Sequence, residues 1–131
     1  MPKVIYLDQN HWINLLRAKL EKSNQNQIEK RTLNAILNAS KDERAIFPIS
    51  NTHLIETYKK KDNQKREQLL DFMIELSNGY GIVTYIAIQK FEIRQAVLKQ
   101  AGLPTKDIRQ YIIGKGFPYI MGHRPEIVNK D

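Results

Sequence analysis

The chain has 131 residues, 41% of them hydrophobic and 27% charged, which suits one globular domain with a core and excludes a largely disordered chain. It contains no cysteine, and this excludes both a disulfide framework and a thiolate metal site. Lysine and arginine (21) outnumber aspartate and glutamate (14), so the net charge of +7 favours a polyanionic partner such as nucleic acid.

The first part of the chain alternates short apolar runs with helical patterns. The run at 3–7, KVIYL, is short and rich in β-branched residues, which predicts a buried strand. Apolar residues then recur at helical intervals over 12–20, and a second helix is expected over about 26–40. The run at 44–50, RAIFPIS, predicts a second strand, with Pro48 near its end because proline cannot donate to a strand ladder.

A third helical region follows the second predicted strand. Ser50 or Asn51 can cap a helix that begins near residue 52, because both side chains accept hydrogen bonds from backbone N–H groups. The polar run at 59–66, KKKDNQKR, interrupts the apolar pattern. Apolar residues then repeat at i, i+3, i+4 and i+7 over 69–76, which predicts an amphipathic helix.

The last part of the chain has a weaker pattern. The β-branched run at 82–88, IVTYIAI, predicts a third strand, and apolar residues at 93–97 predict a helix that ends at AGLP. Thr105 can cap a further helix that runs to Ile113. The segment 114–131 has three glycines, two prolines and no clear period, so the sequence assigns it no element.

Strands that alternate with helices indicate a parallel sheet covered by helices. We therefore expect an α/β fold of three layers, α/β/α, with a central parallel sheet. Residues 1–131 are expected to form a single domain, either complete or the N-terminal part of a longer one. No apolar run reaches about 18 residues, and the N-terminus lacks the pattern of a signal peptide, so we expect a cytoplasmic protein without a membrane partner.

Acidic residues follow each of the predicted strands. Asp8 comes directly after the first strand, Glu56 lies one helical turn after the second, and Glu92 follows the third. Ligands of open parallel sheets bind at the carboxyl ends of the strands, so these side chains are expected to converge there. Converging carboxylates favour a hard divalent cation, which predicts a Mg²⁺ or Mn²⁺ site able to activate water against a phosphodiester.

Each of these residues also has a structural interpretation. Asp8 can act as an N-cap, Glu56 can interact with a helix dipole, and Glu92 can lie on a solvated helix face. His11 and His53 could contribute to a zinc site, but one histidine beside each acid favours packing or hydrogen bonding to the ligands instead. The polar run at 59–66 is either a solvated surface or a strip that contacts phosphates.

Two stretches, VIYLDQNHWINL and FPISNTHLIETYKK, resemble the PIN-like ribonuclease family, to which many toxin–antitoxin toxins belong. The resemblance covers roughly residues 3–90 and implies that Asp8 and Glu56 are the first two metal-binding acids. It also places Asn10 and Ser50 beside the metal. It further implies RNA as substrate, an antitoxin protein as a possible partner and a possible homodimer.

The later part of the chain departs from the family pattern. PIN-like domains have a third acid and often a fourth, and here Glu92 is the candidate for the third, in a displaced position. The expected function is therefore a metal-dependent endoribonuclease. The alternatives are a non-catalytic module that binds RNA or a protein partner, and a phosphatase or other small-molecule hydrolase that uses the same metal pocket.

Overall fold

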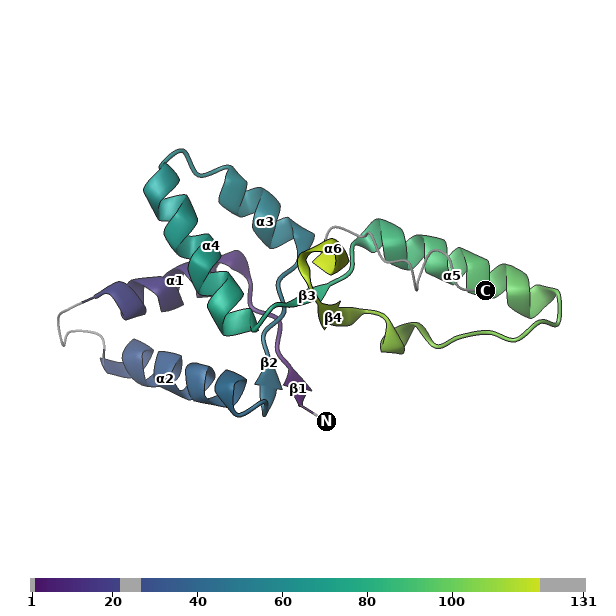
Figure 1. Cartoon of the computed structure of the whole chain (residues 1–131), viewed down its shortest axis with the longest axis horizontal. Helices are drawn as coiled ribbons and strands as arrows, with labels where there is room; N and C mark the ends of the chain where they lie inside the picture. Colours follow the sequence, from purple (N-terminus) through teal and green to yellow (C-terminus); the bar gives the residue numbers. More distant parts are fainter. Residues whose placement is uncertain (1, 22–26, 121–131) are drawn as a thin grey trace.

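The structure, a computed structural model, describes residues 2–21 and 27–120, and these residues are mostly helical. Helices α1, α2, α3 and α4 gather on one side of the molecule, and α5 extends from the opposite side (Figure 1). In chain order the elements are β1 (Lys3–Val4), α1 (Gln9–Leu20), α2 (Gln27–Lys41), β2 (Ala45–Ile46), α3 (Asn51–Tyr58), α4 (Asn63–Ser77), β3 (Tyr80–Ile82), α5 (Tyr85–Gln100), η2 (Ile108–Gln110), β4 (Ile113–Lys115) and α6 (Phe117–Ile120).

The expectation of a three-layer α/β/α fold with a central parallel sheet is wrong. Within the described residues the strands form two separate pairs, β1 with β2 in parallel and β3 with β4 antiparallel. A single parallel bridge between Ile49 and Gly81 connects the segment after β2 to β3. The helices therefore pack mainly on one another around short extended segments.

The third predicted strand is the largest local error. Thr84 accepts a hydrogen bond from the backbone N–H of Ala87 at 3.3 Å and caps α5, so most of the run at 82–88 becomes the first turn of a helix. β-branched residues favour strands through packing on a sheet, and within the described residues β4 pairs with this run only at Ile82. The helix cap at Thr84 therefore outweighs the strand preference of these residues.

The predicted helix from Thr105 to Ile113 is also wrong. Asp107, not Thr105, caps the short 3₁₀ helix η2, and its carboxylate receives hydrogen bonds from the Arg109 side chain and backbone. Ile113 begins β4, which pairs with β3. Of the segment that the sequence left unassigned, residues 114–120 complete β4 and form α6, and 121–131 lie outside the described residues.

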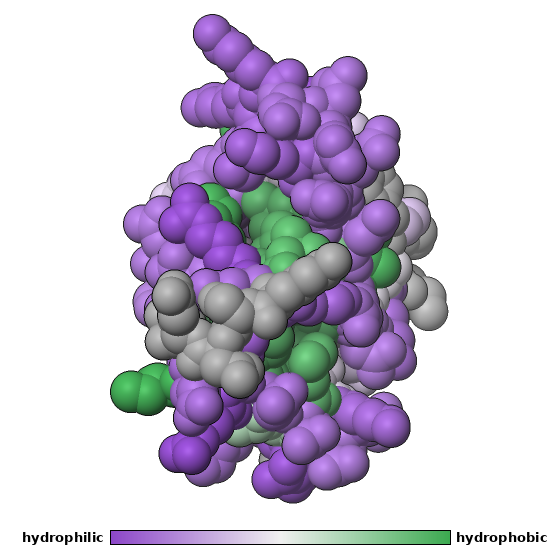
Figure 2. Space-filling model, turned by 90° about the vertical axis from the view of Figure 1, so that its left-hand side faces the viewer, coloured by the Kyte–Doolittle hydropathy of each residue, from purple (hydrophilic) through white to green (hydrophobic). Residues whose placement is uncertain are grey.

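The core lies between α1, α2, α3 and α4. Trp12 is fully buried and its ring meets the ring of Phe72 edge-on, with centroids 6.1 Å apart. The other buried apolar residues packed with them are Leu15, Ala18, Leu33, Ala45, Phe47, Ile49, Leu54, Leu69, Met73, Leu76 and Ile120. Figure 2 views this side of the molecule and shows hydrophilic side chains over most of it, with a band of apolar side chains between them.

Two smaller features complete the fold. A second cluster of Val83, Ala87 and Phe91 anchors α5 against η2, apart from the main core. None of the helices in residues 2–21 and 27–120 combines the length and the apolar character that crossing a bilayer requires.

Candidate functional site

Asp8 is the N-cap of α1, as its structural interpretation expected. Its Oδ1 accepts a hydrogen bond from the backbone N–H of His11 at 2.9 Å and lies 2.7 Å from Nδ1 of the same residue. The backbone hydrogen bond from His11 lowers the pKa of the Asp8 carboxyl below its usual 3.8. The exposed carboxylate is therefore ionised at neutral pH and fixed at the start of the helix.

Ser50 and His53 form a reciprocal cap at the start of α3. The Ser50 hydroxyl accepts a hydrogen bond from the backbone N–H of His53 at 3.3 Å. In return, the backbone N–H of Ser50 donates to Nδ1 of His53 at 3.0 Å. The helix thus begins at Asn51, where the sequence predicted a cap and a helix start.

The His53 ring connects the start of α3 to the segment that follows β1. Its Nε2 lies 2.6 Å from the carbonyl oxygen of Leu7, the residue before Asp8. Because Nδ1 accepts from Ser50, Nε2 carries the proton and donates to Leu7. Both ring nitrogens are thereby engaged, so this buried histidine is a link between two segments and is poorly placed to bind a metal.

A second hydrogen bond joins the same two segments on the other side of Asp8. Nε2 of Gln9 donates to the Thr57 hydroxyl at 2.9 Å, and that hydroxyl donates to the backbone carbonyl of His53 at 2.7 Å. Asp8 lies between Leu7 and Gln9 in the sequence, and Glu56 lies between His53 and Thr57. Asp8 and Glu56 are 48 positions apart in the sequence, yet residues on either side of one are hydrogen-bonded to residues on either side of the other.

The pKa of His53 reflects the proximity of these two segments. Burial lowers the pKa of His53 below 6.5, whereas the Leu7 carbonyl and the negative charges of Glu56 and Asp8 raise it. Both carboxylates therefore lie within electrostatic reach of one ring. Glu56 is exposed on α3, as Asp8 is at the start of α1, so both are accessible to a solvated ion.

The structure does not bring Glu92 into this group. Glu92 is exposed on α5, which extends away from α1 and α3 (Figure 1). In the described part of the chain, no three histidine, aspartate or glutamate side chains are grouped closely enough to hold a metal ion. Asn10 is exposed in the first turn of α1, next to Asp8. The structure thus links the segments that carry Asp8 and Glu56, and Glu92 lies on a different element.

Two residues of the site were missed by sequence reasoning. Thr57 is fully buried and receives the Gln9 hydrogen bond, and the ring of Tyr6 stacks on His53 with centroids 4.9 Å apart. The signal for Thr57 was its spacing of four residues from His53, which places both on the buried side of α3. Tyr6 gave no signal, because its role depends on a segment more than forty residues away.

The buried neutral state of His53 predicts a pH dependence of stability. The unfolded histidine has the higher pKa, so between the lowered folded pKa and 6.5 the unfolded chain binds more protons. The free energy of unfolding should therefore fall as the pH drops through this window and level off above about pH 7. Urea unfolding between pH 5 and 8 measures the effect, and a variant His53→Gln should show a flatter profile.

Comparisons with family models, curated proteins and solved structures find no match to this chain.

Proposed function

We propose that the protein is a metal-dependent endoribonuclease in which Asp8 and Glu56 hold Mg²⁺ or Mn²⁺. The observation that carries the proposal is the pair of hydrogen bonds, Leu7 with His53 and Gln9 with Thr57, that holds the two acidic segments together. The resemblance of the same segments to PIN-like ribonucleases supplies the reaction. The net charge of +7 suits a polyanionic substrate.

The donor set fits a hard cation. Mg²⁺ keeps several waters and is often held by one or two carboxylates together with substrate phosphates, so two acids suffice for it. Both His11 contacts to Asp8 use Oδ1, so a cation would approach Oδ2. A bound cation would supply activated water and neutralise charge on the phosphodiester.

The protein groups around the two acids have complementary tasks. Helices α1 and α3 both begin at this site, and the positive ends of their dipoles favour an anionic phosphate. Asn10 and Ser50 lie in the first turn of α1 and at the cap of α3, where amide and hydroxyl groups can orient substrate oxygens. His53 holds the two segments in register.

A second candidate function is a non-catalytic module that binds RNA or a protein partner. The observation that favours it is the position of Glu92, because the described residues supply no third acid beside Asp8 and Glu56. This candidate predicts RNA binding that weakens steeply with salt, without cleavage under any metal condition.

An RNA cleavage assay with Mg²⁺, Mn²⁺ or EDTA separates the two candidates. We expect cleavage that EDTA abolishes and that Asp8→Asn or Glu56→Gln lowers by at least about 100-fold, the upper end of the loss seen for partners outside the metal shell. Asparagine caps a helix as well as aspartate does, so Asp8→Asn keeps α1 intact and removes only the charge.

Matched substitutions control for charge and folding. Asp71→Asn on α4 changes an exposed acid on an element that carries neither Asp8 nor Glu56 and should leave cleavage unchanged. Glu92→Gln tests the third acid directly, and we expect it to have little effect. Cleavage that survives both Asp8→Asn and Glu56→Gln would refute the metal assignment.

A further inference from the structure

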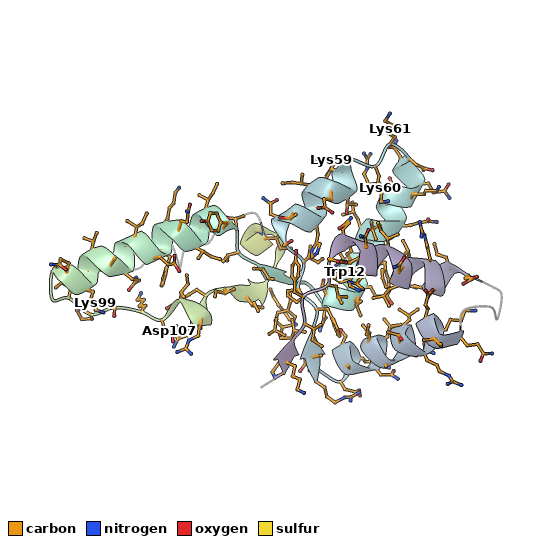
Figure 3. All side chains as sticks on the ribbon, turned by 180° about the vertical axis from the view of Figure 1, so that it is seen from behind. Trp12, Lys59, Lys60, Lys61, Lys99 and Asp107 are labelled. Atoms are coloured by element: carbon orange, nitrogen blue, oxygen red, sulfur yellow. The ribbon has the colours of Figure 1, made fainter. Side chains whose placement is uncertain are left out.

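The turn between α3 and α4 carries a concentration of positive charge. Five cationic residues lie within eight positions, 59–66, and the single acid among them is Asp62. The Asp62 carboxylate caps α4 by accepting from the backbone N–H of Lys65 at 3.2 Å, so its charge is directed at the helix end. Figure 3 shows Lys59, Lys60 and Lys61 at this turn, with Lys61 at its tip.

The three lysines at the start of this turn are accessible to solvent. Lys59 and Lys61 are exposed and Lys60 is half-buried, and none of the three forms an ion pair within the described residues. Other cations of the chain do pair, as Lys19 does with Glu75 at 2.6 Å. The same turn forms the hydrophilic protrusion at the top of Figure 2. Unpaired cations clustered at a protrusion create a positive potential that attracts an anionic polymer.

An exposed aromatic ring lies at the base of the turn between α3 and α4. Tyr58 keeps 66% of its surface exposed, and the Arg66 guanidinium lies 5.6 Å from the centre of its ring. The Arg66 side chain is held by a hydrogen bond to Asn63 at 2.6 Å. Exposed aromatic rings among cations are the elements on which unpaired bases stack, whereas the bases of a duplex are already stacked on each other.

The turn between α3 and α4 directly follows the helix that carries Glu56. Lys59 follows Glu56 by three positions, which is the spacing of neighbours on one side of a helix. The Lys59 backbone keeps a right-handed helical conformation at the end of α3. From Glu56 to Lys59 the rise along the helix axis is about 4.5 Å, so one short strand can reach both groups.

We propose that this turn binds the backbone of single-stranded RNA beside the two carboxylates, with one base stacked on Tyr58. The proposal rests on the proposed nuclease function, because it names the surface that holds the substrate. The residues of this surface, called here the cationic turn, are Tyr58, Lys59, Lys60, Lys61, Lys65 and Arg66.

Binding is tested with a fluorescently labelled single-stranded RNA in EDTA, where metal-dependent cleavage cannot occur. The triple variant K59Q/K60Q/K61Q should lower the slope of log K against log salt by about 2, because each phosphate contact on a single strand contributes about 0.7. The control K41Q/K90Q/K99Q removes the same charge from exposed lysines elsewhere and should keep the slope. Thermal unfolding of both variants verifies that they fold.

The aromatic ring is tested separately. Tyr58→Ala should weaken binding about 5- to 100-fold without changing the salt slope, and Tyr58→Phe should restore it. A duplex of the same sequence should bind more weakly than the single strand. Equal losses in the two triple variants, or equal binding of duplex and single strand, overturn the proposal.

The two proposals fail in different ways. If the cationic turn is wrong but Asp8→Asn still abolishes cleavage, only the binding surface is rejected. If no cleavage occurs but K59Q/K60Q/K61Q lowers the salt slope, the cationic turn stands and the protein is a binding module.

Discussion

Trp12→Ala is expected to lower the free energy of unfolding by about 3–5 kcal/mol, the usual cost of truncating a buried aromatic side chain. Trp12 is fully buried and contacts two rings edge-on, Phe72 with centroids 6.1 Å apart and His53 with centroids 6.0 Å apart. Alanine would leave a cavity between α1, α4 and α3. Urea unfolding at pH 7.5 measures the loss.

Two further variants test whether the loss of stability comes from burial of the Trp12 ring in the core. Trp12→Phe should cost less than Trp12→Ala, because the phenylalanine ring leaves a smaller cavity. Both substitutions remove the buried indole N–H, which has no hydrogen-bond partner among the described residues. Tyr85→Ala removes an aromatic ring that is 71% exposed and should change stability by no more than about 0.5 kcal/mol. Equal losses for Trp12→Ala and Tyr85→Ala contradict the assignment of the core.

Local signals in the sequence predicted the helices of the first eighty residues, with Asp8 and Ser50 among the candidate caps, whereas the cap of α4 at Asp62 was missed. Asp8 and Ser50 both cap a helix, and the repeat over 69–76 lies on the buried side of α4. These features depend on hydrogen bonds and contacts within a few residues. The amino-acid types of neighbouring residues are therefore sufficient to predict most of these helices.

The fold class could not be predicted because it depends on strand pairing over long distances. The runs at 3–7, 44–50 and 82–88 have the composition of buried strands, yet each keeps no more than three residues in a strand. Composition cannot show how many neighbours a strand will pair with. Alternation of strands and helices therefore predicted a sheet that the described residues do not form.

The candidate site could be predicted in part. The sequence pointed to Asp8 and Glu56, and the structure holds their segments together. It also pointed to Glu92, whose place on α5 depends on the cap at Thr84 that turned a predicted strand into a helix. Because this one element was predicted as a strand, Glu92 was expected in the wrong place.

His53→Ala is expected to destabilise the protein by about 3–5 kcal/mol and to lower the proposed RNA cleavage as well. Truncation leaves a cavity beside Trp12 and removes the partner of the Leu7 carbonyl and of the Ser50 N–H. It also removes one of the two links between the acidic segments. Stability is measured by urea unfolding, and cleavage is measured at a temperature where the variant remains folded.

Two conservative variants assign the effect to one hydrogen bond. Glutamine can place its N–H₂ group near the position of Nε2, so His53→Gln keeps the donor to Leu7 and should keep most of the cleavage. Asparagine can place its oxygen near the position of Nδ1, so His53→Asn keeps the acceptor for Ser50 but loses the link to Leu7, and cleavage should fall. If the two variants retain equal cleavage at equal stability, the link from His53 to Leu7 does not position Asp8 against Glu56, and Gln9 with Thr57 must hold the two acids together alone.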